Sequence, residues 1–274
     1  MQNKLNDTLF YSENIKNVEE GLKSIRNEIM QFVNQIENIE NQIQRYIEYF
    51  NITRFCIFNE PVFIQKAITE LYKRIITEDI PLIAGETTNY LHAEKLLRRL
   101  AASDEINIQT LSQTLGISQK EISETLEILT KSELLNVLYT YGGIDSKLNK
   151  MQKYFFMSPS VRKILLSPLT GMKTTTDLTA KLMEDTVVMY LKRLFKMDSV
   201  VSFSSREKQK NPDLIIETHD KPILCEIGIK KQHTKQITQS RIDYRYGIVL
   251  NTKINDYKIE NKTVFLPFEW FLLI

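Results

Sequence analysis

The N-terminal region carries a heptad pattern that restricts how this chain can fold. Apolar side chains recur at alternating spacings of three and four residues, without an intervening proline, at Ile15, Val18, Leu22, Ile25, Ile29, Phe32, Ile36, Ile39, Ile43 and Tyr46. This spacing predicts one long amphipathic helix from about Ser12 to Phe50. Gly21 is its weak point, because glycine in a helix interior costs about 1 kcal/mol relative to alanine.

Such a helix cannot bury its apolar seam alone. The seam must pair with a second copy of the chain, with a partner protein, or with helices that follow in the same chain. Its many isoleucines and its lack of a single polar specifying residue leave the number of paired copies open. Residues 15–46 are therefore a candidate surface for a homo-oligomer or a protein partner.

Composition and charge exclude several classes of protein. Hydrophobic residues make up 42% and charged residues 26% of the 274 positions, which is ordinary for a globular protein with a sizeable core. The formal net charge of +2 provides no global attraction to nucleic acid or to an anionic membrane. There is neither an apolar signal segment nor a run of roughly 18 apolar residues, so we expect a cytoplasmic protein without membrane contact.

The cysteines and histidines argue against a structural zinc site. Cys56 and Cys225 lie far apart, each in an apolar run, which favours two buried thiols in a reducing compartment. The three histidines do not cluster with them.

Residues 51–90 are predicted to form a helical region after the N-terminal helix of residues 1–50. An amphipathic helix is expected from Val62 to about Thr77, and Pro81 and Gly85 should then break the helical pattern.

Residues 91–150 have the pattern of a winged helix-turn-helix. A short helix should end at Gly116, which suits the left-handed conformation of a tight turn between helices. Ser118 and Glu121 form a capping box for the next helix, and Leu134 to Tyr141 should be a strand. The expected apolar core comprises Leu91, Leu96, Leu97, Leu100, Leu111, Leu115, Ile117, Ile122, Leu126 and Leu129.

The second helix of this module is a poor surface for DNA. Its exposed positions would carry Gln119, Lys120, Glu121, Glu124, Glu127 and Lys131. Three acids against two lysines repel a phosphate backbone, so we expect the module to act as a spacer or a protein contact. A better candidate for nucleic-acid binding is the basic set Lys192, Arg193, Lys196, Arg206, Lys208, Lys210 and Lys231. The alternative for this set is a solvated helix face and loop.

Residues 151–274 are predicted to form an α/β domain, which makes the chain a multi-domain α+β protein. A short strand and a short helix should follow Tyr154, and a long helix should span about Thr176 to Phe195. A further helix is expected near Lys235–Tyr244. Strands are expected at Val200–Ser204, Leu214–Glu217, Ile223–Ile229, Tyr246–Leu250 and Thr263–Leu266.

The segments Asn211-Pro-Asp213-Leu-Ile-Ile-Glu and Ile223-Leu-Cys-Glu226-Ile-Gly-Ile-Lys230 together resemble the core of the PD-(D/E)XK nuclease family. The resemblance implies a restriction-endonuclease-like fold in which Asp213 and Glu226 bind Mg²⁺ or Mn²⁺. Hard cations of this kind prefer carboxylate oxygens, and they activate water and stabilise phosphoryl charge. Glu184, in the preceding helix, matches the supporting acidic residue of the family.

The chain departs from the family at the third position, where glycine (Gly228) replaces the expected lysine. Strand alternation puts Glu226, Gly228 and Lys230 on one face and Cys225 on the buried one, and Lys230 lies ~6.7 Å beyond Gly228. A migrated catalytic lysine therefore remains open. So do plain structural roles, with Asp213 capping a turn and Glu226 as a strand-edge charge.

Four stretches also resemble the C-terminal half of prokaryotic AAA-type ATPases, in which a helical lid precedes a winged helix and a nuclease-like domain. They are the helix-turn-helix, Leu71-Tyr-Lys-Arg-Ile-Ile, Lys153-Tyr-Phe-Phe-Met-Ser-Pro-Ser-Val-Arg and Leu182-Met-Glu-Asp-Thr-Val-Val. No Gly-x-x-x-x-Gly-Lys-Ser/Thr loop is present, so ATP hydrolysis is not expected.

Three functions remain open at this point. The first is a nucleic-acid- or protein-binding module with a degenerate nuclease-like domain. The second is a Mg²⁺-dependent DNA endonuclease that uses Asp213, Glu226 and Lys230. The third is a coiled-coil assembly protein.

Overall fold

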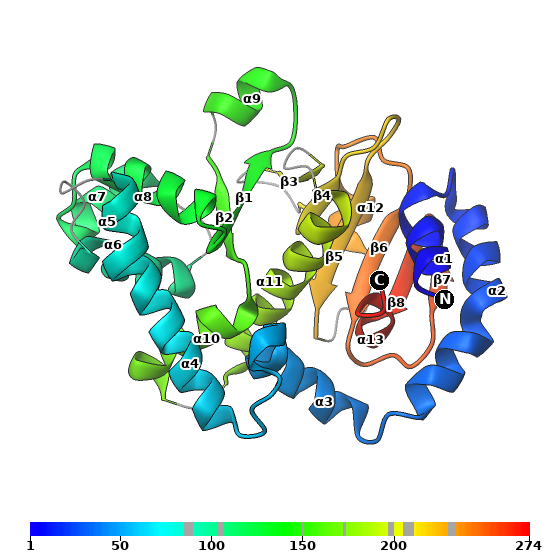
Figure 1. Ribbon diagram of the computed structural model, residues 1–274. Coiled ribbons are helices and arrows are strands. Elements are labelled where there is room, and N and C mark those ends of the chain that lie inside the picture. Colours follow the sequence, from blue (N-terminus) through cyan, green and yellow to red (C-terminus); the bar gives the residue numbers. More distant parts are fainter. Residues whose placement is uncertain are drawn as a thin grey trace. The chain divides into compact units, whose positions relative to one another are not determined.

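The chain forms two compact units, each built from segments that lie far apart in the sequence. The computed structural model describes residues 1–84, 90–103, 107–149, 151–171, 174–196, 200–204, 211–229 and 234–274 (Figure 1). The first unit comprises Met1–Ile43, Thr140–Leu148 and Arg193–Ile274, and the second comprises Gln44–Tyr139 and Asn149–Lys192. These units differ from the four consecutive segments expected from the sequence, because the N-terminal helices pack with the C-terminal strands.

The structure is mixed α+β, and the first unit holds a mixed sheet. Its described strands are β3 (Val201–Phe203), β4 (Leu214–Ile216), β5 (Ile223–Gly228), β6 (Gly247–Asn251), β7 (Lys258–Glu260) and β8 (Thr263–Pro267). They lie in the order β3-β4-β5-β6-β8-β7. Strand β4 is antiparallel to β3 and β5, β6 is parallel to β5 and β8, and β7 is antiparallel to β8.

The five strands expected from residue 200 onward are all present, within one or two residues of their predicted bounds. Strand β7 was not predicted, because its Lys-Ile-Glu sequence carries no run of β-forming residues. The helix expected near Lys235–Tyr244 is much shorter, since α12 covers only Lys235–Thr238. The Ser240 hydroxyl accepts the backbone N–H of Ile242 and forms a turn there, at 3.2 Å.

The prediction of one unbroken helix from Ser12 to Phe50 is wrong. The chain instead forms α1 (Gln2–Asn6), a π-helical turn (Asp7–Tyr11), α2 (Ile15–Asn34) and α3 (Ile39–Arg45). Asn38 adopts a positive φ of 49° between α2 and α3, a left-handed conformation that asparagine tolerates better than most residues. The apolar spacing continues through this point, and periodicity alone therefore could not reveal the break.

The first half of the heptad seam is buried within the chain. Val18, Leu22, Ile25 and Ile29 on α2 are at most 1% exposed, and α2 packs against β8 in the first unit. Phe32, near the end of α2, is 43% exposed. Gly21 is a packing requirement as well as a weak helix former, because a Cβ atom there would lie 2.5 Å from Oγ1 of Thr8.

The second unit is mainly helical. It contains a π-helical turn (Tyr46–Phe50), α4 (Pro61–Arg74), a second π-helical turn (Ile75–Asp79), α5 (Ile80–Ala84), α6 (Tyr90–Ala102), α7 (Ile108–Leu115), α8 (Gln119–Lys131), α10 (Pro159–Thr170) and most of α11 (Thr176–Phe195). Strands β1 (Leu135–Thr140) and β2 (Lys153–Phe156) pair antiparallel. The helix predicted for Thr176–Phe195 is confirmed by α11.

Local signals in residues 91–150 match the structure closely. Gly116 ends α7 with a left-handed φ of 69°, and Ser118 Oγ accepts the backbone N–H of Glu121 at 3.2 Å. Two expectations were wrong: Leu91 is 49% exposed, and Pro81 lies in the first turn of α5, where proline is tolerated. Between the hairpin strands, α9 (Ile144–Asn149) falls largely in the first unit, where Tyr141 donates its N–H to the carbonyl of Phe203.

No helix among the described residues is both long enough and apolar enough to cross a membrane.

Candidate functional site

Glu226 is a fully buried carboxylate in the middle of the sheet. Strand β5 lies between β4 and β6, and all six of its residues are buried. Glu226 itself is 0% exposed. The interpretation of Glu226 as a strand-edge charge is therefore wrong, and the face that it shares with Gly228 is buried like the opposite face. A carboxylate in such a position is costly unless its environment supplies compensating groups.

Asp213 lies opposite Glu226 across the β4–β5 ladder. Leu214 pairs with Cys225, and the next step of this antiparallel register places Asp213 against Glu226. Residues directly opposite each other project to the same face, with Cβ atoms about 5 Å apart. The two acids that the sequence singled out are thus brought together by the fold.

Asp213 also has a structural task. Its Oδ2 atom accepts the backbone N–H of Ile227 at 2.7 Å. Asp213 precedes the first residue of β4, so its carboxylate extends the ladder where the backbone pairing has ended. This bond agrees with the capping role considered for Asp213, but a carboxylate has further lone pairs that can serve a ligand.

The position that would carry the family's lysine is occupied by a buried backbone. Gly228 ends β5 and pairs with Asn251 on β6. Lys230 and Lys231 lie outside the described residues, so the migrated-lysine hypothesis stays a prediction. Glu184 is a half-buried residue of α11 in the second unit, and within the first unit it is only Asp213 and Glu226 that the geometry brings together.

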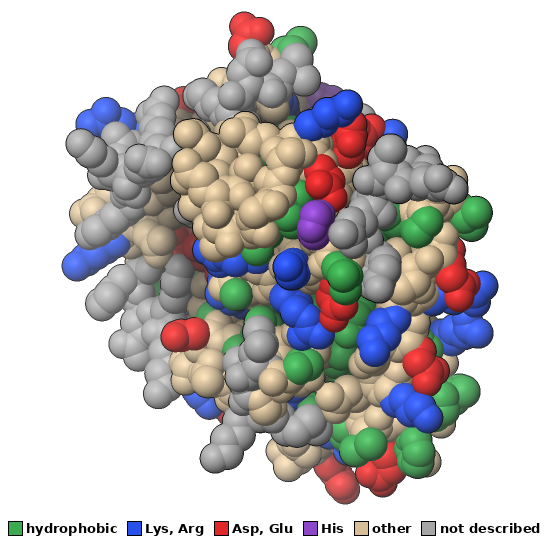
Figure 2. Space-filling view, turned by 90° about the vertical axis from the view of Figure 1, so that its left-hand side faces the viewer, with side chains coloured by type: hydrophobic (Ala, Val, Ile, Leu, Met, Phe, Trp, Pro, Cys, Tyr) green, Lys and Arg blue, Asp and Glu red, His purple; other side chains and the backbone are tan. Residues whose placement is uncertain are grey.

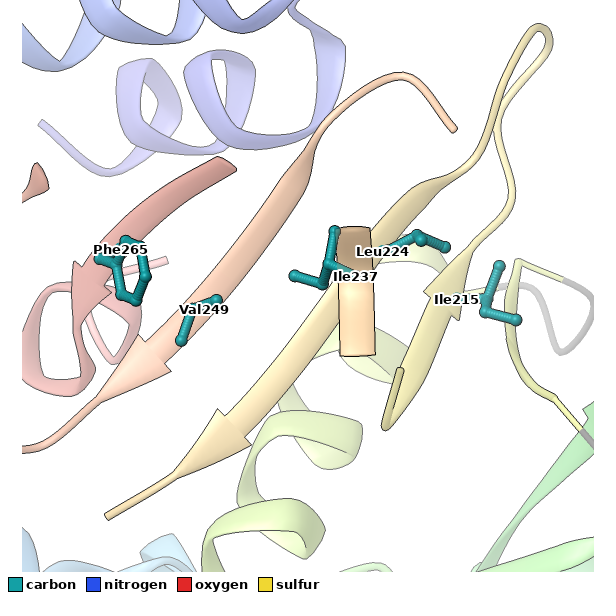
Figure 3. Packing of buried hydrophobic residues seen from close by; sticks show 5 residues of the cluster. All are labelled: Ile215, Leu224, Ile237, Val249 and Phe265. Atoms are coloured by element: carbon teal, nitrogen blue, oxygen red, sulfur yellow. The ribbon is translucent and has the colours of Figure 1, made fainter. Parts of the chain in front are cut away.

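An apolar cluster adjoins the acidic pair on the same face of the sheet. It consists of Ile215, Leu224, Ile237, Val249 and Phe265 (Figure 3). Val249 pairs directly with Glu226, and Ile237 reaches this face from α12. Gly247 permits that approach, since a Cβ atom there would lie 2.8 Å from Ile237. The carboxylates therefore border a water-poor surface, where charge interactions are stronger than in bulk solvent.

The donor set fits a divalent cation only in part. Mg²⁺ is commonly held by one or two carboxylates together with waters and substrate phosphates, and Asp213 with Glu226 supplies such a pair. In the part of the chain that the structure describes, no group of three or more His, Cys, Asp or Glu side chains could hold a metal. The thiols take no part: Cys225 is buried as expected, whereas Cys56 is exposed, contrary to prediction.

The predicted basic set is described only in its first part. Arg193 is exposed near the end of α11, Lys196 is exposed just beyond it, and Lys192 is half-buried. Cations at a helix C-terminus are also favoured by the helix dipole, which is a sufficient structural reason for them. Arg206, Lys208, Lys210 and Lys231 lie outside the described residues.

The surface of α8 is largely neutralised by ion pairs. Lys120 lies 3.7 Å from Glu124, and Lys131 lies 2.6 Å from Glu127. Nδ1 of His92 lies 2.7 Å from Oε1 of Glu121. On the face shown in Figure 2, basic side chains are interspersed with acidic and hydrophobic ones. This arrangement agrees with the expectation that α8 is a poor DNA-reading helix.

The second unit contains buried ion pairs that sequence reasoning missed. Arg162 donates from Nε to Oδ2 of Asp185 at 2.5 Å and from Nη2 to Oδ1 at 2.9 Å. Both side chains are 0% exposed. Lys163 forms a second buried ion pair with Glu48. The available signal was that each basic residue sits in an otherwise apolar helical stretch, Val161 to Leu166, where an unpaired charge would be untenable.

Comparisons with known proteins give relatedness without an activity. Residues 59–173 match a domain of unknown function, DUF8612. The chain is similar to an uncharacterized protein of Methanocaldococcus jannaschii, with 28% identity over 226 residues that cover 80% of this chain and 47% of the relative. It thus spans about half the length of that relative. No solved structure matches the chain.

Proposed function

We propose that this chain is a nucleic-acid-binding protein whose PD-(D/E)XK nuclease-like domain binds without cleaving, and that it has no ATPase activity of its own. The observation that carries the proposal is the pairing of Asp213 with Glu226 on one face of the sheet, next to a glycine at position 228. The ancestral acids persist, while the group that would assist water attack is absent from its usual position.

The strand arrangement is consistent with this ancestry. An antiparallel run of β3, β4 and β5 is followed by the short α12 and by the parallel strand β6. The helix α11 precedes the sheet in sequence. In the second unit, the left-handed turn at Gly116 and the β1–β2 pair support a winged-helix reading of residues 91–150.

Hydrolysis of a phosphodiester needs more than two acids. Asp213 and Glu226 would hold Mg²⁺ or Mn²⁺, which when bound supplies positive charge toward a phosphate. A base or cation must also orient the attacking water, and Gly228 has no side chain to do so. One oxygen of Asp213 is already bonded to the N–H of Ile227, which reduces its freedom to reorganise during a reaction.

We favour nucleic acid over protein as the ligand of this domain because of its local charge. Arg193 and Lys196 are exposed just before the sequence segment that contains Arg206, Lys208 and Lys210. The ion-paired α8 surface is a weaker candidate for phosphate contacts. Under this proposal the winged-helix-like module serves as a spacer or a protein contact.

The proposal is tested by measuring binding and cleavage on the same DNA. Affinity for a labelled duplex is measured by fluorescence anisotropy between about 50 and 200 mM salt, where phosphate-dominated binding falls steeply. The double variant Arg193→Glu/Lys196→Glu should bind more weakly and show a shallower salt slope. The matched control Lys120→Glu/Lys131→Glu, on α8, should bind like the wild type. Equal losses in both variants, or salt-independent affinity, contradict this assignment of the surface.

The cleavage arm distinguishes the rival enzyme. We expect no nicking of supercoiled plasmid with Mg²⁺ or Mn²⁺. Sustained nicking that is abolished by Asp213→Ala and by Lys230→Ala, but retained in Lys231→Ala, would instead establish a metal-dependent endonuclease with a migrated lysine.

A further inference from the structure

The carboxyl ends of β5 and β6 place a buried amide beside the position that lacks its lysine. Asn251 is the last residue of β6 and is 2% exposed. In the parallel register, Gly228 pairs with Asn251 and Glu226 pairs with Val249. Paired residues project to the same face, so Asn251 shares a face with Gly228 and Glu226.

The orientation of the Asn251 amide is fixed by its neighbours. Its Oδ1 atom accepts the backbone N–H of Lys253 at 2.8 Å. The next residue, Thr252, donates its hydroxyl to the carbonyl of Ile229 at 2.8 Å, which ties the end of β6 to the end of β5. With its oxygen engaged toward Lys253, the amide offers its Nδ2 group as a donor.

Distance and space allow that donor to serve Glu226. Strands lie about 4.8 Å apart and residues rise about 3.3 Å, so the Cα atoms of Glu226 and Asn251 are separated by about 8 Å on the diagonal. Glutamate and asparagine side chains together can span such a separation. Gly228 has no side chain to stand between them.

We infer that Asn251 is a positioning residue for the acidic pair, with its Nδ2 group directed at the Glu226 carboxylate over the bare backbone of Gly228. This inference rests on the proposed role of Asp213 and Glu226 as the site. A neutral amide can hold a carboxylate in one rotamer through a hydrogen bond. It carries no charge to stabilise an attacked phosphate, and thus the substitution fits a pocket that retains a ligand without cleaving it.

The competing explanation is that Asn251 only caps the turn at Lys253. The variant Asn251→Asp separates the two, because aspartate keeps the oxygen that accepts the Lys253 N–H but replaces the donor with a second acceptor. Aspartate caps such turns as well as asparagine does. A pure cap therefore predicts an unchanged unfolding temperature, whereas a positioning donor predicts repulsion between the introduced carboxylate and Glu226.

The experiment is a cycle of four full-length proteins followed by thermal unfolding at neutral pH: wild type, Asn251→Asp, Glu226→Gln and the double variant. We expect Asn251→Asp to lower the unfolding midpoint by roughly 3 °C or more. Adding Glu226→Gln should restore at least half of that loss, since the glutamine amide can then donate to the aspartate. The control Asn261→Asp, at an exposed turn, makes the same charge change and should leave the midpoint in place.

Additive effects of the two substitutions, or an unchanged midpoint in Asn251→Asp, would overturn the inference. The readout is independent of DNA, so failure here is separate from failure of the binding test: the former removes Asn251 from the site, and the latter removes the nucleic-acid ligand.

Discussion

Arg162 on α10 and Asp185 on α11 form a two-bonded ion pair in which neither side chain has any exposed surface. The pair is part of a wider set of bonds. Nη1 of Arg162 donates to the carbonyl of Ala101 at 3.0 Å, and Oδ1 of Asp185 accepts the N–H of Phe156 at 2.9 Å. The two residues therefore join α6, α10, α11 and β2, the main elements of the second unit.

Removing one partner of this pair should destabilise the protein strongly. Arg162→Met leaves the Asp185 charge buried and without its guanidinium, and losses of about 3–5 kcal/mol are typical in such cases. Denaturant unfolding of the variant measures the loss. The control is Arg74→Met, in the same unit, whose partner Glu78 and own side chain are both exposed. Its loss should stay below about 1 kcal/mol, and similar losses in both variants would contradict a special role for the buried pair.

Gly21→Ala should destabilise the protein even though alanine is the better helix former. The added Cβ would lie 2.5 Å from Oγ1 and 2.7 Å from Cγ2 of Thr8, so the π-helical turn must move away from α2. Overpacking of this kind costs about 1–3 kcal/mol, which outweighs the helical gain of about 1 kcal/mol.

Thr8→Ala provides the matched rescue for this prediction, because it removes both atoms that the new Cβ would meet. The double variant should be more stable than Gly21→Ala alone in thermal unfolding. No rescue would mean that the glycine is needed for a reason other than its contact with Thr8.

The heptad seam should stabilise the chain from within rather than through self-association. Leu22 is 0% exposed on α2, so Leu22→Ala should cost about 2–5 kcal/mol. Phe32 is 43% exposed, and Phe32→Ala should cost less. The unfolding midpoint should not change with protein concentration, since a folded state stabilised by association would follow mass action. A midpoint that rises with concentration, and a large loss in Phe32→Ala, would instead favour an oligomeric seam.

Local sequence signals predicted elements well where one physical rule dominated. The alternation of buried strands, the glycine at the end of α7 and the serine cap of α8 each depend on nearby residues alone, and each is present in the structure. The opposition of Asp213 and Glu226 also followed from two adjacent strands and their turn.

Features set by distant contacts could not be predicted in the same way. The heptad spacing indicated that α2 buries one face, but it did not reveal that the partner would be the C-terminal sheet or that Asn38 interrupts the helix. The exposure of Glu226 depended on the strand order, which places β6 on the far side of β5. Arg162 and Asp185 are 23 residues apart, and nothing in either segment names the other.

Tyr154 should make the stability of the second unit depend on alkaline pH. Burial, with a smaller contribution from Tyr139, raises the pKa of Tyr154 to about 12. Its hydroxyl donates to Oε1 of Gln152 at 2.6 Å. In the unfolded chain the tyrosine pKa is about 10, so between these values the folded state keeps a proton that the unfolded state loses.

The sign follows from this difference in bound protons. The contribution of Tyr154 is fully present below about pH 10 and is lost progressively as pH rises toward 12, to a total of about 2–3 kcal/mol. Tyr154→Phe should be slightly less stable than the wild type at pH 8, because it lacks the bond to Gln152. Its stability should then fall less steeply above pH 10, so that the two curves approach each other or cross. Denaturant unfolding at several pH values measures both curves, with Tyr11→Phe at an exposed position as the control. Parallel curves for the wild type and Tyr154→Phe would show that this hydroxyl ionises equally in both states, and that its burial has no part in alkaline unfolding.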